Sequence, residues 1–125
     1  MPANYRIDEE LGVVFGTFAG TVTLSDLIEA QRALMADPRF RPHLSLLLDT
    51  RDAADVRLSA EDVRTLSRST ALGPGARRAI VATTDLRFGL ARMYEMLSAG
   101  RPDQTAVFRT IEDALDWLRE GRAKQ

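Results

Sequence analysis

Polar side chains follow two apolar runs of the chain, and these positions are the strongest candidates for chemistry. Residues 44–48 form a short, almost unbroken apolar run that stops at Asp49, and a second run over residues 79–82 ends in threonines and an acidic residue. A short apolar run closed by polar residues is typical of a strand buried on both faces. Ligands of open α/β sheets bind at the carboxyl ends of such strands. We therefore predict a ligand site made of Asp49, Thr50, Arg51, Thr84, Asp85 and Phe88.

Each kind of side chain in this predicted site has a role. Asp49 accepts hydrogen bonds, Arg51 pairs with an anion, and Phe88 supplies an apolar wall. The position at the strand ends, rather than any catalytic signature, carries this prediction.

Catalytic and metal-binding alternatives find little support in the sequence. His43 is the single histidine and precedes the apolar run, so it belongs at the amino end of the sheet, away from the expected site. Cysteine is absent, which excludes thiolate nucleophiles and disulfides. A hard cation could bind to Asp49, Asp52 and Asp55 only if their carboxylate oxygens converged on one point. Aspartates in loops more often face water or cap helices. We predict no enzymatic activity, no metal and no cofactor.

Arginines form a second candidate for anion binding. Arg64 and Arg68 share one predicted helix face, and Arg77 with Arg78 could join them. An anion or partner site is one interpretation of this cluster. The favoured alternative is a solvated face on which Glu61 supports Arg64.

Length and composition limit the kind of protein. The chain of 125 residues suits a single domain, 1–125, and its formal net charge of −1 gives no attraction to nucleic acid or anionic membranes. Its apolar runs are far shorter than the roughly 20 residues of a membrane helix, so we predict no stable membrane insertion. The lack of cysteine and of an apolar leader favours a cytoplasmic protein.

Hydrophobic periodicity predicts the elements that position these residues. Two alternating runs over residues 5–10 and 13–19 predict a hairpin. Segments with helical spacing then alternate with short apolar runs, which predicts alternating helices and strands. The segment 51–57 is expected to be a charged loop. The predicted order is ββαβαβαβα: an α/β fold with a mostly parallel five-stranded sheet, four helices, and an antiparallel first strand at an edge.

The third predicted helix has apolar residues on two faces. Its inner stripe is predicted to hold Leu86, Leu90, Met93, Tyr94 and Leu97. Phe88 and Met96 lie off that stripe. They predict either a homodimer contact or a rotated helix that packs them in the core.

The order of elements and the end of the chain resemble a known family. Residues 105–118 read TAVFRTIEDALDWL, and with the N-terminal hairpin they resemble the SpoIIAA-like family, bacterial relatives of STAS domains with a fold like the lipid-binding CRAL-TRIO domain. The resemblance implies a small interaction or ligand-binding module. STAS anti-sigma-factor antagonists carry a phosphorylated serine after the central strand. The nearest serine here is Ser59, whose surroundings depart from that pattern and favour a helix N-cap.

The expected function is therefore non-enzymatic binding of a protein partner or a small apolar or acidic ligand. One alternative is a CRAL-TRIO-like carrier of lipid, which needs an apolar cavity of several hundred Å³. Another is a regulator switched by phosphorylation of Ser59.

Overall fold

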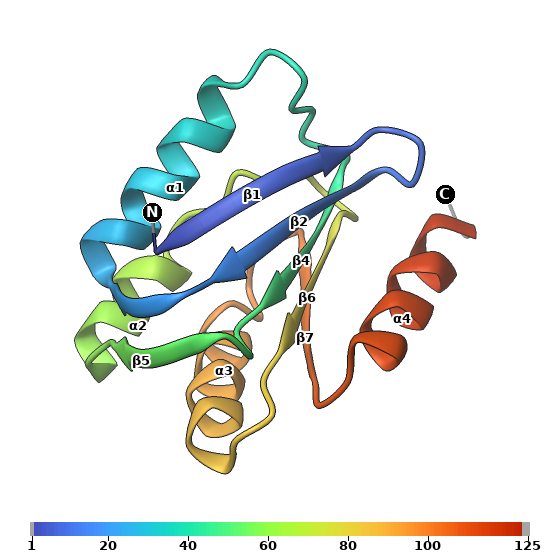
Figure 1. The fold of residues 1–125 in the computed structure, drawn as a ribbon. Coiled ribbons are helices and arrows are strands. Elements are labelled where there is room, and N and C mark those ends of the chain that lie inside the picture. Colours follow the sequence, from blue (N-terminus) through green and yellow to red (C-terminus); the bar gives the residue numbers. More distant parts are fainter. Residues whose placement is uncertain (1, 124–125) are drawn as a thin grey trace.

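A five-stranded sheet forms the centre of the protein, whose computed structural model describes residues 2–123 (Figure 1). The strand order across the sheet is β1-β2-β4-β6-β7. The strands span Ala3–Asp8 (β1), Val13–Phe18 (β2), Ser45–Asp49 (β4), Arg77–Val81 (β6) and Gln104–Phe108 (β7). The apolar run around Leu47 thus becomes the central strand, as predicted.

The first strand lies at one edge and is the antiparallel member of this sheet, which confirms the predicted hairpin. β1 pairs antiparallel with β2, whereas β2–β4, β4–β6 and β6–β7 are parallel pairs. The hairpin turns at Gly12, whose φ of 70° suits a residue without a side chain. Parallel pairing brings the ends of β4 and β6 to the same edge of the sheet.

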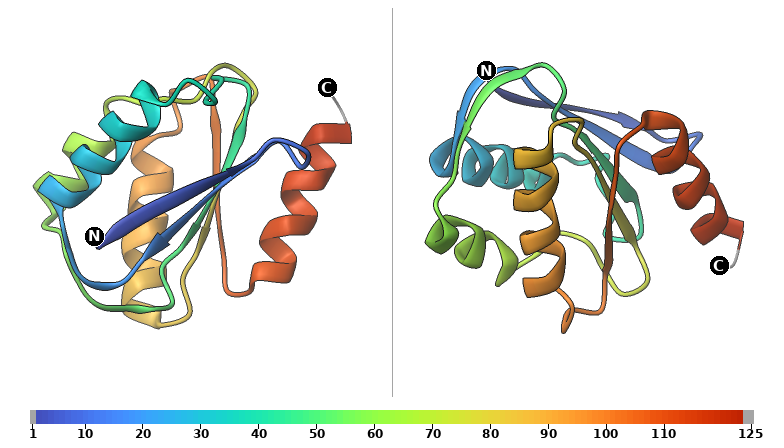
Figure 2. Two further views of the ribbon diagram at one scale, coloured as in Figure 1. Left: turned by 45° about the horizontal axis from the view of Figure 1, so that its top comes forward. Right: turned by 90° about the horizontal axis from the view of Figure 1, so that it is seen from below.

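Four helices cover the sheet on two sides. They span Leu24–Ala36 (α1), Ala60–Ser67 (α2), Asp85–Leu97 (α3) and Ile111–Ala123 (α4). Figures 1 and 2 show α4 alone on one face and α1, α2 and α3 together on the other. Thr23 with Asp26 and Ser59 with Asp62 form the capping boxes that start α1 and α2. The cap at Ser59 was expected from the sequence.

Two further strands correct the predicted order. β3 (Gly20–Thr23) and β5 (Ala53–Arg57) pair in parallel as a separate two-stranded sheet. The expected loop over residues 51–57 was therefore wrong. Charged residues hide the strand pattern there, because β5 buries little more than Ala53 and is defined by its pairing with β3.

The pleat of the strands divides their side chains between the two helical layers. Val13, Leu47, Ala79 and Val81 point toward α4, where they form one cluster with Ala114 and Leu118. Val14 and Leu46 belong to a second cluster on the opposite face. The two faces of the sheet differ in how completely they are filled, and this difference creates the candidate site.

Candidate functional site

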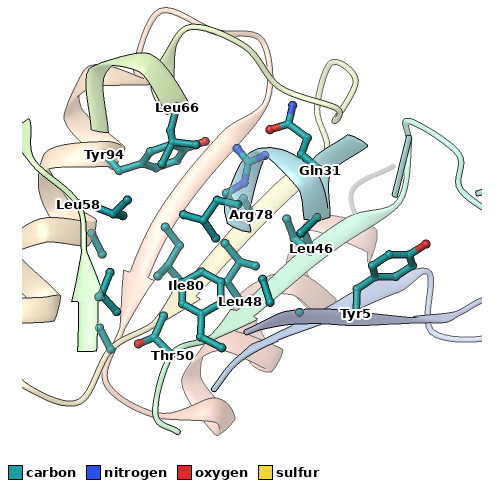
Figure 3. Close-up of a pocket in the computed structure, with 18 of the residues that line it drawn as sticks. Tyr5, Gln31, Leu46, Leu48, Thr50, Leu58, Leu66, Arg78, Ile80 and Tyr94 are labelled. Atoms are coloured by element: carbon teal, nitrogen blue, oxygen red, sulfur yellow. The ribbon is translucent and has the colours of Figure 1, made fainter. Parts of the chain in front are cut away.

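An apolar pocket lies between the sheet and the helices α1, α2 and α3. Its volume is about 180 Å³, and it is partly open to the protein surface. Its floor comes from β1, β2, β4 and β6, and its walls come from the three helices and β5 (Figure 3). The apolar lining includes Leu46, Leu48, Leu66, Ile80 and Leu90.

The pocket exists because the helices do not fill this face of the sheet. Leu47 on the α4 side is 1% exposed, whereas Leu48, its neighbour on the pocket side, is only half-buried. None of the residues of α3 is fully buried. Gly16 pairs with Leu48 in the sheet and has no side chain to add to the floor, where a Cβ atom would lie 2.7 Å from Leu48 Cδ2.

A few polar side chains interrupt the apolar lining. Thr50 is buried at the end of β4, and its hydroxyl donates to the Val81 carbonyl over 2.7 Å. Arg87 Nη1 donates to the Thr50 carbonyl over 3.0 Å, which ties α3 to the central strand. Arg78 and Tyr94 also line the pocket. The groups at the strand ends are thus occupied in structural hydrogen bonds, and Arg78 is the charged group on the pocket floor.

Arg78 belongs to a buried charge cluster that we call the Arg78 cluster: Arg78, Arg101, Asp103, Thr70 and Tyr94. Asp103 contacts both guanidinium groups, with Oδ2 3.2 Å from Arg78 Nη1 and 3.0 Å from Arg101 Nη2. Arg78 Nη2 donates to the Thr70 hydroxyl over 3.2 Å. The Tyr94 ring lies beside both cations, 5.5 Å from Arg78 Cζ and 5.3 Å from Arg101 Cζ. Burial lowers the pKa of the Arg78 guanidinium, since a charge far from water is disfavoured.

At the carboxyl end of β4, Asp49 and Arg51 bind each other. Arg51 donates from Nε and Nη2 to the two carboxylate oxygens over 2.9 Å each, and its backbone N–H donates over 3.0 Å. The side-chain hydrogen bonds from Arg51 lower the pKa of Asp49. The anion that Arg51 contacts is therefore the carboxylate of Asp49, two residues before it in the chain.

At the carboxyl end of β6, the other predicted residues serve the start of α3. Thr84 is the N-cap and accepts from Arg87 N–H, while Asp85 pairs with Arg109 over 2.9 Å. Arg109 also covers Phe88, with its Cζ 4.2 Å from the ring centre. Among the six residues of the predicted site, Thr50 alone lines the pocket. A ligand site at the strand ends stays a prediction.

The pleat separates the arginines that the sequence grouped together. Arg64 and Arg68 lie at the surface near Glu61, at 3.2 and 3.7 Å, which fits the solvated face. Arg77 points toward α4, where it stacks on Trp117 at 4.7 Å and donates to its carbonyl over 2.8 Å. Arg78 points the other way, into the pocket, so a single four-arginine site is wrong.

Ser59 is a helix cap, as the sequence favoured. Its hydroxyl accepts from Asp62 N–H over 3.0 Å, and its own N–H donates to the Asp62 carboxylate over 3.0 Å. A phosphate on this hydroxyl would meet the negative charge of Asp62. Phosphorylation of Ser59 stays a prediction.

The inner stripe predicted for the third helix is wrong at both ends. Leu86 is 85% exposed and Leu97 is 43% exposed, so neither end of the stripe packs in the core. Met96 is 64% exposed, and Phe88 is half-buried beneath Arg109. The homodimer through Phe88 and Met96 stays a prediction.

Other kinds of site find no counterpart in the part of the chain that the structure describes. Within residues 2–123, no group of three or more histidine, aspartate or glutamate side chains is placed to hold a metal ion. Over the same residues, each helix is too short or too polar to cross a bilayer.

The sequence did not identify the pocket, although it contained one signal for it. Arg78 directly precedes the apolar residues Ala79, Ile80 and Val81, so a charged side chain enters a buried strand. That placement could have marked Arg78 as functional. The apolar lining carried no such signal, because pocket residues and core residues follow the same periodicity.

Comparisons with known proteins identify the fold. No family model matches the chain, and no curated protein matches it. The chain is similar to the crystal structure of an uncharacterized protein of the DUF3478 family with a SpoIIAA-like fold, from Shewanella loihica PV-4. The TM-score is 0.61 at 20% sequence identity, over 93% of this chain and 91% of that one. Together with the five-stranded, mostly parallel sheet and its four helices, this likeness shows that the chain has a SpoIIAA-like fold.

Proposed function

We propose that this protein is a non-enzymatic binding module that holds a small apolar ligand between its sheet and the helices α1–α3. The apolar pocket of about 180 Å³ carries the proposal. Protein interiors are close-packed, so a hollow of this size in the middle of a small domain needs a reason. An engineered cavity of about 150 Å³ in another protein binds benzene, which sets the scale of a fitting ligand.

The size of the pocket favours a compact ligand over a long-chain lipid. A carrier of long acyl chains was expected to need an apolar cavity of several hundred Å³, and this pocket is smaller. The described residues that line it include no carboxylate, histidine or serine. Such a lining supports binding rather than proton transfer or nucleophilic attack.

The neutral fluorescent probe N-phenyl-1-naphthylamine tests this function. We expect its emission to rise on binding the wild-type protein, as the probe leaves water for the pocket. Ala30 lines the pocket from α1, so Ala30→Trp should fill the space and weaken binding by at least about tenfold. Ala33 is exposed on the same helix, so Ala33→Trp is the matched control and should bind like wild type.

Two results would contradict the proposal. One is a wild-type protein that leaves the probe's emission unchanged. The other is an Ala30→Trp variant that binds as tightly as Ala33→Trp, which would place any binding outside this pocket.

A further inference from the structure

Arg78 is a charged residue in a pocket whose lining is mostly apolar. Arg78 and Ile80 alternate with Ala79 on β6, so both point toward the pocket (Figure 3). Arg78 is 7% exposed, and its guanidinium carbon lies 5.5 Å from the centre of the Tyr94 ring, which lines the same pocket. A charge in such a place is costly unless it is matched by an opposite charge.

The opposite charge within the cluster is already used by another arginine. Arg101 holds both oxygens of Asp103, from Nε to Oδ1 over 3.1 Å and from Nη2 to Oδ2 over 3.0 Å. Arg78 only shares Oδ2. Asp103 is the carboxylate that pairs with Arg78, at 3.2 Å, and Arg101 is the second cation on that carboxylate, at 3.0 Å. Two cations and one anion leave the buried cluster with one positive charge in excess.

Arg78 also has hydrogen-bonding capacity to spare. A guanidinium carries five N–H donors, and within residues 2–123 the acceptors of Arg78 are Asp103 and the Thr70 hydroxyl. A planar donor group of this kind matches the two oxygens of a carboxylate. The excess positive charge of the cluster and the unused N–H donors of Arg78 both favour the binding of an anion.

We propose that the pocket binds small carboxylates with an apolar body, and that the carboxylate head accepts hydrogen bonds from Arg78. The body of the ligand lies against Leu48, Ile80 and Leu90, which line the same pocket. Binding of the head neutralises the Arg78 cluster, while burial of the body removes apolar surface from water. This inference rests on the proposed function, because it names the ligand class of the same pocket.

A series of eight-carbon probes separates the head from the body. Octanoate, octan-1-ol and octylamine carry the same apolar chain with negative, neutral and positive heads at neutral pH. Each is titrated against N-phenyl-1-naphthylamine bound to the full chain, so all compete for one site. We expect octanoate to displace the probe at a concentration at least about tenfold lower than octan-1-ol does, and octylamine to be the weakest.

Arg78→Met tests whether Arg78 binds the carboxylate head of the ligand. Methionine keeps an apolar side chain of similar length, so octanoate should lose its preference over octan-1-ol in this variant. Binding of the neutral probe by the variant shows that the pocket has folded. Arg92→Met is the matched control, because Arg92 lies at the surface of α3 with Glu95 as its partner, and it should keep the preference.

The possible outcomes separate the two proposals. If the neutral probe binds but octanoate is no better than octan-1-ol, the binding module stands and the carboxylate inference is overturned. A preference that survives Arg78→Met, or that falls as much in Arg92→Met, also overturns the role of Arg78. If neither the neutral probe nor any eight-carbon compound binds, the proposed function fails and this inference fails with it.

Discussion

At the scale of single residues, arginine side chains make many of the polar contacts of this protein, and arginines adjacent in sequence make different contacts. Arg77 stacks on Trp117 in the α4 layer, whereas Arg78 enters the pocket on the other face of the sheet. Arg51 is held by Asp49, and Arg109 covers Phe88. For Arg77 and Arg78, side-chain direction within the strand, rather than residue type, decides which cation faces the pocket.

The Arg78 cluster predicts unequal effects of removing its members. Asp103→Ala leaves the guanidinium groups of Arg78 and Arg101 without a carboxylate. We expect the free energy of unfolding, measured in urea, to fall by about 3–5 kcal/mol. In Arg78→Met, Asp103 keeps its two hydrogen bonds from Arg101. The free energy of unfolding of this variant should therefore stay within about 1 kcal/mol of wild type. Equal losses in the two variants would mean that Arg78 is needed to balance Asp103 and that the cluster has no charge in excess.

At the scale of elements, β5 and α2 form one wall of the pocket from a stretch that reads as mostly polar. Val56 of β5 and Val63 and Leu66 of α2 line the pocket. The helix is short, and its capping box at Ser59 sets where it starts. The position of this wall therefore depends on local hydrogen bonds as well as on packing.

Removal of this cap should measure how much of the wall it supports. Ser59→Ala loses the side-chain acceptor for Asp62 N–H, and we expect a loss of about 1 kcal/mol in urea unfolding. Ser59→Asp retains a capping carboxylate and should cost less. Ser25 is exposed in the first turn of α1 and is not a cap, so Ser25→Ala is the control, within about 0.5 kcal/mol of wild type. Equal stability of Ser59→Ala and wild type would contradict a capping role.

At the scale of the whole molecule, the sheet is packed tightly on one face and loosely on the other. α4 closes its face with a cluster that includes Leu47 and Ala79, 1% and 0% exposed. On the opposite face, the helices α1, α2 and α3 and the sheet line the apolar pocket. The fold thus combines a layer that supplies stability with a layer that leaves room for a ligand.

Adjacent leucines of the central strand test this asymmetry. Leu47→Ala opens a cavity in the filled layer and should cost about 2–5 kcal/mol. Leu48→Ala enlarges a space that already exists, so its cost should be smaller by at least about 1 kcal/mol. Urea unfolding of the two variants gives the comparison directly. Equal costs would indicate that the pocket is closed in solution.

The fold class, the hairpin, the central strand and the helix cap at Ser59 could all be predicted from the amino-acid sequence. These features follow from local signals: alternation, helical spacing, turn residues and capping boxes. Pattern reading missed β3 and β5, because both strands depend on each other and β5 is rich in charge. It also placed Leu86 and Leu97 on an inner face, since periodicity shows which residues are apolar and not what stands opposite them.

The location of the pocket could not be predicted from the sequence and follows from tertiary packing. The ends of β4 and β6 meet at one edge as expected, yet most of their polar groups bind each other or cap α3. The pocket arises from the distance between three helices and the sheet, and from the direction that the pleat gives to Arg78. A hollow is a property of surfaces brought together from distant parts of the chain, and no local pattern records it.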